Sequence, residues 1–281
     1  MNLTNYHSHC TFCDGKAPME EFVKSAIQAG FTAYGVSSHA PLPFATRWTL
    51  KQEKVPDYLA ELSLLKKKYA GQIELYAGME IDYLNDQQNP AIPYFQELPL
   101  DYRIGSVHLI YTEEGEIIDT DTNPENFKAL LDKHFHGDLQ PMVSRYFEAS
   151  MRMVELGGFD FIGHADKISF NANQCQEGAT EQPWYKKKRE ELFAMIAAKG
   201  MMMEINTKAF LKRGCFFPAR EHFSLIHELG IPVVVNSDAH LPGLVNAGRL
   251  EALKTLKEAG FDSVCELSEG KWKECRNYVS E

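Results

Sequence analysis

The residues best suited to metal chemistry begin near the N-terminus, where NYHSHCTFCDG spans residues 5–15. His7 and His9 are separated by one residue. If this stretch is extended, both imidazoles lie on the same face, because strand side chains alternate with period two. Asp14 follows shortly after. Imidazole and carboxylate groups suit zinc, manganese and iron(II), so the stretch predicts a metal site.

More ligand-type side chains recur along the chain, each at the end of a run rich in β-branched or aromatic residues. They are His39, Glu80, His108, His164, Asp238 and His240. An isolated histidine is more often an ordinary core or surface residue. Here that interpretation would have to hold at the same structural position in six of seven such runs. A shared metal site is therefore the simpler interpretation.

The runs that carry these residues alternate with longer amphipathic stretches, a pattern typical of βα units around a parallel sheet. The seven expected strands are the approach to residue 7 and residues 33–39, 73–81, 102–110, 159–165, 201–207 and 231–240. Five of the six expected helices end on glycine next to a strand. We predict one α/β domain over residues 1–281, folded as a closed or nearly closed barrel. Because the carboxyl ends of parallel barrel strands face one mouth, the ligand-type residues should converge there.

The number of candidate ligands bears on the number of ions. Eight residues, or nine with Asp14, exceed what one tetrahedral or octahedral ion needs, so we expect two or three divalent metals. A carboxylate such as Glu80 can bridge two ions, whereas an imidazole cannot. Ions about 3.5–4 Å apart would share a hydroxide that is nucleophilic at neutral pH.

Cys10 and Cys13 offer competing interpretations of the same stretch. A closed structural zinc site usually pairs two short-spaced cysteine pairs, and the sequence has no second pair. A thioredoxin-like motif would lack its usual βαβ context and leave His7 and His9 unexplained. We interpret both cysteines as loop residues.

The overall composition favours a small substrate. The hydrophobic share of 44% and charged share of 24% are those of an ordinary globular protein. The net charge of −10 opposes binding to nucleic acid or to an anionic membrane. The sequence has neither an apolar run of about 18 residues nor a signal-like N-terminus, so we expect a cytoplasmic protein with reduced thiols.

The dispersed motifs together resemble one known family. The His7-x-His9 pair, GMEIDY around Glu80, IGSVHLI around His108, IGHADKI around His164 and NSDAHLP near the end are similar to the PHP (polymerase and histidinol phosphatase) family. SHAPLPF, DYRIGSVH and EINTK resemble its histidinol-phosphatase branch. The resemblance implies a distorted (β/α)7 barrel with its active site at the C-terminal ends of the strands. It also implies a trinuclear centre of Zn, Mn or Fe and hydrolysis of L-histidinol phosphate in histidine biosynthesis.

The resemblance further implies how the ligands divide among three ions. The first ion would take His7, His9, Glu80 and Asp238; the second would share Glu80 and take His108 and His164; the third would take Asp14, His39 and His240. Glu80 and Asp238 are the expected catalytic residues. Glu80 would bridge two ions, and either Asp238 or a metal-bound water would protonate the leaving alkoxide.

Charge favours a phosphate ester as substrate. Three divalent ions, three carboxylates and a hydroxide leave roughly two positive charges, which match a phosphomonoester dianion. Lys167, Lys208 and Arg213 follow strand ends and are candidate phosphate-binding residues. Arg47 and Trp48 lie in a long loop that could cover the mouth, with Phe44 or Trp48 packing on a flat substrate ring. For the basic residues the alternative is a solvated surface charge, and for the loop it is simple packing.

Several functions stay open at this point. The same chemistry could act on a nucleotide, a sugar phosphate or a phosphotyrosyl protein. A rival of another class is a non-catalytic, metal-stabilised binding module, which the full ligand set disfavours. A nuclease is disfavoured because the acidic chain shows no basic stripe. The sequence leaves the oligomeric state open.

Overall fold

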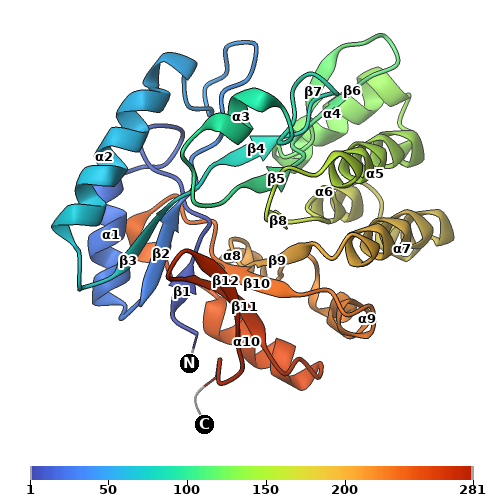
Figure 1. Cartoon of the computed structure of the whole chain (residues 1–281). Helices are drawn as coiled ribbons and strands as arrows, with labels where there is room; N and C mark the ends of the chain where they lie inside the picture. Colours follow the sequence, from blue (N-terminus) through green and yellow to red (C-terminus); the bar gives the residue numbers. More distant parts are fainter. Residues whose placement is uncertain (1, 280–281) are drawn as a thin grey trace.

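The structure, a computed structural model, describes residues 2–279 and is built on a ring of parallel strands (Figure 1). Seven strand runs form the ring within this range, with β3 and β4 as the two halves of one run broken at Gly78. Their bounds are β1 Thr4–Asn5, β2 Ala33–Val36, β3 Glu74–Ala77, β4 Glu80–Asp82, β5 Ile104–Ser106, β8 Phe161–Ile162, β9 Met202–Asn206 and β10 Val233–Asn236. These runs coincide with the seven strands expected from the sequence.

The ring is distorted at two seams. Regular pairing gives one sheet of order β1-β2-β3 and another of order β10-β9-β8-β5-β4. Single parallel bridges join the two sheets, at Ser8 with Ala239 and at His39 with Glu80. At the first seam the His9 amide donates to the Ala239 carbonyl at 2.8 Å. The distorted barrel expected from the sequence is therefore confirmed, and both seams lie beside candidate ligands.

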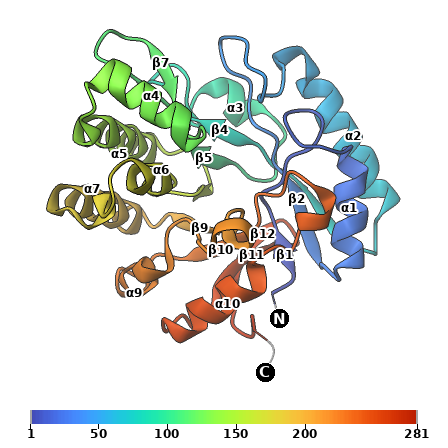
Figure 2. The same ribbon diagram turned by 180° about the vertical axis from the view of Figure 1, so that it is seen from behind.

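Helices surround the ring on its outside (Figures 1 and 2). Their bounds are α1 Met19–Gln28, α2 Val55–Lys68, α3 Pro93–Glu97, α4 Pro124–Phe135, α5 Leu139–Leu156, α6 Ile168–Cys175, α7 Pro183–Ala198, α8 Phe210–Arg213, α9 Phe223–Glu228 and α10 Arg249–Glu258, with 3₁₀ turns at Gln52–Lys54, Ala179–Glu181, Arg220–His222 and Pro242–Leu244. Helices α1, α2 and α10 pack directly on ring strands, and α1 buries Phe22, Val23 and Ala26 on that side. None of the helices between residues 2 and 279 has the length and apolar character to cross a membrane.

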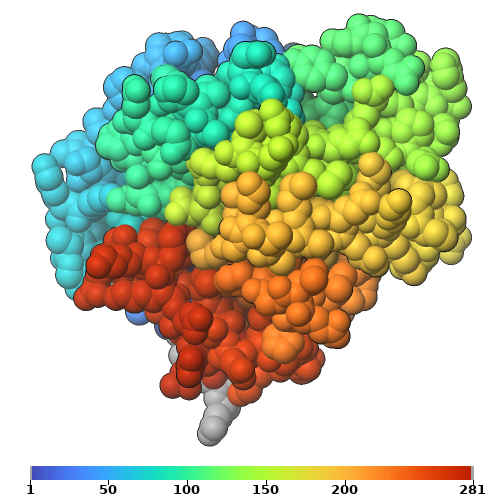
Figure 3. Space-filling model, turned by 45° about the vertical axis from the view of Figure 1, so that its right-hand side comes forward, coloured from blue at the N-terminus to red at the C-terminus, as the bar shows by residue number. Residues whose placement is uncertain are grey.

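The N-terminal end of the ring is filled by aromatic residues and covered by a hairpin. Tyr6, Tyr102 and Phe161 are fully buried there. The hairpin consists of β11 Val264–Ser268 and β12 Lys271–Cys275, and its Leu267 exchanges two hydrogen bonds with the Tyr6 hydroxyl, at 2.8 and 2.9 Å. Figure 3 shows this hairpin, in red, against the turquoise segment that follows β3. This end is closed, so access to the interior lies at the opposite end.

Several elements were not expected from the sequence. They are α3, α6, α8, the hairpin β11–β12, and a second hairpin of β6 Leu109–Tyr111 and β7 Ile117–Asp119. They lie outside the βα alternation, in connections that lack its regular period. Because residues 1, 280 and 281 lie outside the described range, a single domain over residues 1–281 stays a prediction.

The close approach of β2 to Tyr102 generates a stability prediction. A Cβ atom on Gly35 would lie 2.2 Å from the Tyr102 hydroxyl, which itself donates to the Tyr6 carbonyl at 2.6 Å. We expect Gly35→Ala to lower the free energy of unfolding by about 1–3 kcal/mol through overpacking, as measured by urea titration. Gly243→Ala is the matched control, because a Cβ atom at that position would meet open space and its φ is not positive. Equal effects of the two substitutions would contradict the overpacking account.

Candidate metal centre

The carboxyl ends of the ring strands bring all nine predicted ligand residues together. In four overlapping groups, each residue offers one ligand atom within 4.8 Å of the others in its group. The groups are His9, Asp14, His39 and His240; His7, His164 and Asp238; His7, His9 and Glu80; and His39, Glu80 and His108. The first contains the third set implied by the family resemblance, with His9 added. The other groups divide the remaining residues differently from the implied sets, since His39 also joins Glu80 and His108.

Glu80 lies at the centre of the cluster. Its Oε2 atom is 3.1 Å from His7 Nε2 and 2.9 Å from His39 Nδ1, while its Oε1 atom is 2.9 Å from His164 Nε2. The side chain is fully buried. Burial alone would raise the pKa of Glu80, but the charges of His7, His39 and His108 outweigh it and lower the pKa well below its usual value. Glu80 is therefore held as a carboxylate.

Two of the nine residues have an unusual backbone conformation. His164 has φ of 26° and Asp238 has φ of 47°, in the region that non-glycine residues seldom adopt. Such conformations cost about 1–3 kcal/mol each and concentrate at functional sites. Each of these two residues comes just after the end of its strand, and its unusual backbone conformation turns the side chain into the mouth of the barrel.

The residues present fit a metal centre on a criterion independent of the family resemblance. Buried polar atoms normally have a hydrogen-bond partner. Among the described residues, His7 Nε2, His9 Nε2, Asp14 Oδ1 and Glu80 Oε2 are buried and make no hydrogen bond, although Glu80 Oε2 lies within 3.1 Å of two imidazole nitrogens. All four are ligand-type atoms in the same cluster. Cations between them would satisfy every one.

Asp238 lies beside the cation of Lys208. Lys208 Nζ is 3.2 Å from Asp238 Oδ1 and 3.4 Å from His240 Nε2. Burial would raise the pKa of Asp238, but the charges of Lys208 and His7 lower it well below its usual value. A carboxyl group with such a low pKa is suited to bind a cation and poorly suited to donate a proton, so these surroundings disfavour Asp238 as the general acid.

A hollow of about 180 Å³ opens above the cluster. Its lining residues are Asp14, His39, Trp48, His108, Asp119, Asp121, Lys208 and His240. The Trp48 ring packs edge-on against two imidazoles, with centroids 4.8 Å from His39 and 5.6 Å from His108. The metal-type residues form its floor, and one aromatic ring and two further carboxylates form its walls.

Of the four basic residues predicted to bind substrate, Lys208 is the one that lines this hollow. Lys167 is largely buried and pairs with Asp121 at 2.5 Å. Burial would lower its pKa, but the charges of Asp121 and Asp238 raise it, so Lys167 faces the centre as a cation. The Arg213 guanidinium instead lies 3.7 Å from the centre of the Phe170 ring, and Arg47 is exposed in its loop. The structure does not bring these two arginines into contact with the cluster.

Two buried carboxylates beside the cluster were missed in the sequence analysis. Glu204 accepts from His7 Nδ1 at 2.7 Å, and Asp82 accepts from His108 Nδ1 at 2.8 Å. The alternation of strand side chains could have indicated Asp82, which is two residues from Glu80 in GMEID. Glu204 stands in MMMEINT with Asn206 at the same spacing, inside the one strand without a predicted ligand.

The two cysteines lie in the turn after His9 and have free thiols. Cys13 Sγ is 3.5 Å from His9 Nδ1, and Cys10 Sγ is 3.6 Å from the Ser38 hydroxyl. No cysteine joins a metal-type group among residues 2–279. This agrees with the interpretation of both as loop residues.

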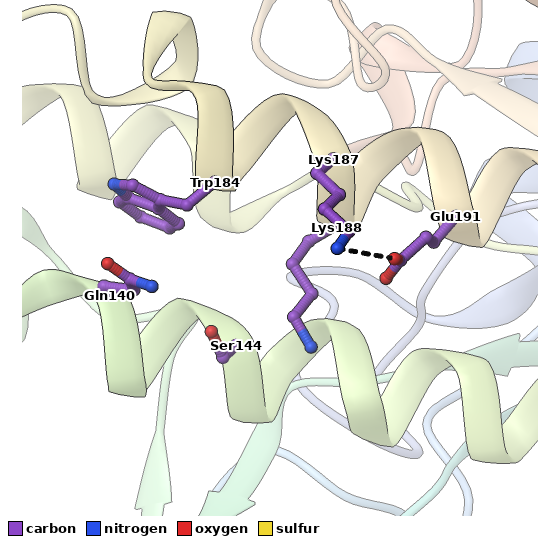
Figure 4. Close-up of a pocket in the computed structure, with 6 residues that line it drawn as sticks. All are labelled: Gln140, Ser144, Trp184, Lys187, Lys188 and Glu191. Carbon is purple, nitrogen blue, oxygen red and sulfur yellow. Dashed lines mark ion pairs between the residues drawn. The ribbon is translucent and has the colours of Figure 1, made fainter.

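A second hollow, of about 310 Å³, lies between α5 and α7, away from the strand ends (Figure 4). Trp184, Lys187 and Lys188 are among its lining residues. Lys187 pairs with Glu191 at 4.0 Å, drawn as the dashed line, and Lys188 pairs with Glu148 at 2.9 Å. Its charges are thus neutralised locally, and we assign it no part in the chemistry.

Comparison with known proteins gives consistent results. The chain is 27% identical over 271 residues to a "probable histidinol-phosphatase" of Deinococcus radiodurans, covering 93% of this chain and 95% of that protein. It is 25% identical to the histidinol-phosphatase of Bacillus subtilis, covering 86% and 95%. Its fold matches histidinol phosphate phosphatase from Lactococcus lactis, solved with zinc, L-histidinol and phosphate, with a TM-score of 0.73, 20% identity and coverage of 96% and 98%. The PHP domain family model matches residues 5–208, and the chain therefore belongs to the PHP domain family.

Proposed function

We propose that this protein is a metal-dependent phosphomonoesterase that hydrolyses L-histidinol phosphate to L-histidinol and phosphate, a step of histidine biosynthesis. The observation that carries the proposal is the convergence of nine ligand-type residues under a small hollow, with several buried ligand atoms unpaired. The names of the relatives from Deinococcus radiodurans and Bacillus subtilis support the choice of substrate. The acidic chain favours a small substrate over nucleic acid or a membrane.

We propose His7, His9, Asp14, His39, Glu80, His108, His164, Asp238 and His240 as the ligands of two to three divalent ions. Zinc, manganese and iron(II) all suit this set of nitrogen and oxygen donors. Such ions supply Lewis acidity toward phosphoryl oxygens and lower the pKa of water. Glu80 is the residue best placed to be shared between ions, because both of its oxygens lie within 3.1 Å of imidazole nitrogens.

The residues around the hollow would bind the rest of the substrate. Lys208, and Lys167 behind Asp121, place positive charge where a phosphate dianion would lie. Trp48 offers an indole surface on which a flat imidazole can pack. Hydrolysis breaks the bond between phosphorus and the ester oxygen and forms one to a water oxygen. Because Asp238 is held in its charged form, we assign it to the metal ligands and not to proton transfer. The leaving alkoxide then takes its proton from water.

The first test is a phosphate-release assay with metal-replete protein against a panel of phosphomonoesters. We expect L-histidinol phosphate to give the highest kcat/KM, because the hollow combines a phosphate-binding floor with an aromatic wall. Nucleotides, sugar phosphates and phosphotyrosine peptides serve as the comparison. A higher kcat/KM for one of these would reassign the substrate, and no release from any member would favour the binding-module alternative.

Metal content gives a second prediction. Protein purified without chelator should carry about two to three transition-metal ions per chain, as counted by elemental analysis. Glu80→Ala should lower metal content and activity more than loss of any single histidine, because Glu80 contacts the largest share of the cluster. Active protein without metal would exclude this mechanism. A milder effect than His108→Ala would show that Glu80 is not shared.

The basic residues give a third prediction. Lys208→Met and Lys167→Met should each lower kcat/KM by about 30- to 1,000-fold, the loss of about 2–4 kcal/mol of transition-state stabilisation. Metal content should stay at the wild-type value, because a protonated lysine is not a ligand. We expect a smaller loss for Arg213→Met, whose guanidinium packs on Phe170. A loss as large as that of the lysines would place Arg213 on the phosphate in the substrate complex.

A further inference from the structure

Glu204 is the most extensively hydrogen-bonded carboxylate of the barrel interior, and the proposed ligand set does not use it. It lies in the middle of β9, is fully buried, and is paired in register with Val234 of β10. Its Oε1 accepts from His7 Nδ1 at 2.7 Å and Asn236 Nδ2 at 3.0 Å. Its Oε2 accepts from the His164 amide at 2.9 Å and Asn206 Nδ2 at 3.0 Å.

These contacts bear on which nitrogen of His7 is free. An imidazole that donates from Nδ1 keeps its lone pair on Nε2. His7 Nε2 is 3.1 Å from Glu80 Oε2 and is one of the buried atoms without a hydrogen-bond partner in the described part of the chain. The carboxylate of Glu204 thus fixes both the orientation of the His7 ring and the nitrogen that it turns to the centre.

The same side chain supports three of the nine candidate ligands. It holds the His7 ring directly, and it holds the backbone amide of His164 at the strained turn after β8. Asn206, which donates to Glu204, also donates to Asp238 Oδ2 at 3.2 Å. One carboxylate therefore links the ends of β1, β8, β9 and β10.

A carboxylate is the group that this position requires. All four partners of Glu204 are donors, and a carboxylate accepts on both oxygens. A glutamine of the same shape would turn its NH₂ group toward two donors whichever way it was oriented. With the NH₂ group toward His7, Nδ1 could only accept, and the ring proton would move to Nε2, the nitrogen that must stay free to bind a cation. With the NH₂ group on the other side, the His164 amide and Asn206 would lose their acceptor.

We propose that Glu204 is a positioning residue of the metal centre, which sets the metal affinity of the site by orienting His7, His164 and Asp238. The inference rests on the proposed ligand roles of these three residues. Glu204 does not touch the substrate, and its effect is exerted through His7 above all.

The test is the zinc affinity of the purified full chain, measured by competition with a chromogenic chelator. Glu204→Gln should weaken zinc binding by about 10- to 100-fold, the usual range for loss of a group that orients a ligand. Asp166→Asn is the matched control: Asp166 is equally buried but bonds the Tyr185 hydroxyl at 2.6 Å. Its zinc affinity should stay within about 3-fold of the wild-type value, a much smaller change than that expected for Glu204→Gln. Wild-type affinity in Glu204→Gln would overturn the proposal.

A double-mutant cycle separates positioning from a general loss of structure. If Glu204 acts through His7, Glu204→Gln should cost clearly less affinity in a His7→Ala background than in the wild type. Equal losses in both backgrounds would show that Glu204 does not act through His7.

If Glu204→Gln fails to fold, Glu204→Asp carries the test. This variant keeps the charge but withdraws the oxygens from His7, and wild-type affinity in it would also overturn the proposal. A wild-type chain that binds no zinc would refute the metal centre itself, an outcome distinct from either of these.

Discussion

The burial of one carboxylate determines much of this structure. Glu80 is fully enclosed, with imidazoles on several sides. A buried ion costs several kcal/mol unless opposite charges and hydrogen bonds compensate for it. Here the compensation comes from residues that are far apart in sequence, and they can meet only where a ring of parallel strands ends. The buried charge of Glu80 is therefore compensated only when the ring of strands closes correctly.

The residues around Glu80 need hydrogen-bond partners of their own. Imidazoles that turn one nitrogen toward Glu80 have a second nitrogen to satisfy inside the barrel, and Glu204 and Asp82 accept from two of them. Glu204 in turn needs Asn206 and Asn236. The polar residues at the carboxyl ends of the strands thus form one connected network. The aromatic residues around Tyr102 fill the N-terminal end of the ring and support this network.

The sequence predicted the strands and the convergence of ligand-type residues because both follow from periodicity. His39, Glu80 and His164 each end an apolar run, and the carboxyl ends of parallel strands share one edge. Glu204 could not be singled out on the same basis, because a glutamate inside a strand is as compatible with an exposed face as with a buried network. The hairpin β6–β7 brings Asp119 and Asp121 to the hollow. It lies in a connection outside the βα alternation, where the sequence shows no regular period that would predict it.

The contrast between the lysines and the arginines has the same origin. A side chain on a strand end is placed by the backbone, so its position can be inferred from the register alone. Lys208 lies two residues after the end of β9 and pairs with Asp238, and Lys167 lies five residues after the end of β8 and pairs with Asp121 beside the hollow. Arg213 is several residues further along, after a short helix that directs it onto Phe170. The precision of a prediction from sequence thus falls with distance from the strand end. Because the metal-type residues sit on strand ends and the walls of the hollow on connections, the barrel can keep its hydrolytic centre while substrate choice changes in the loops.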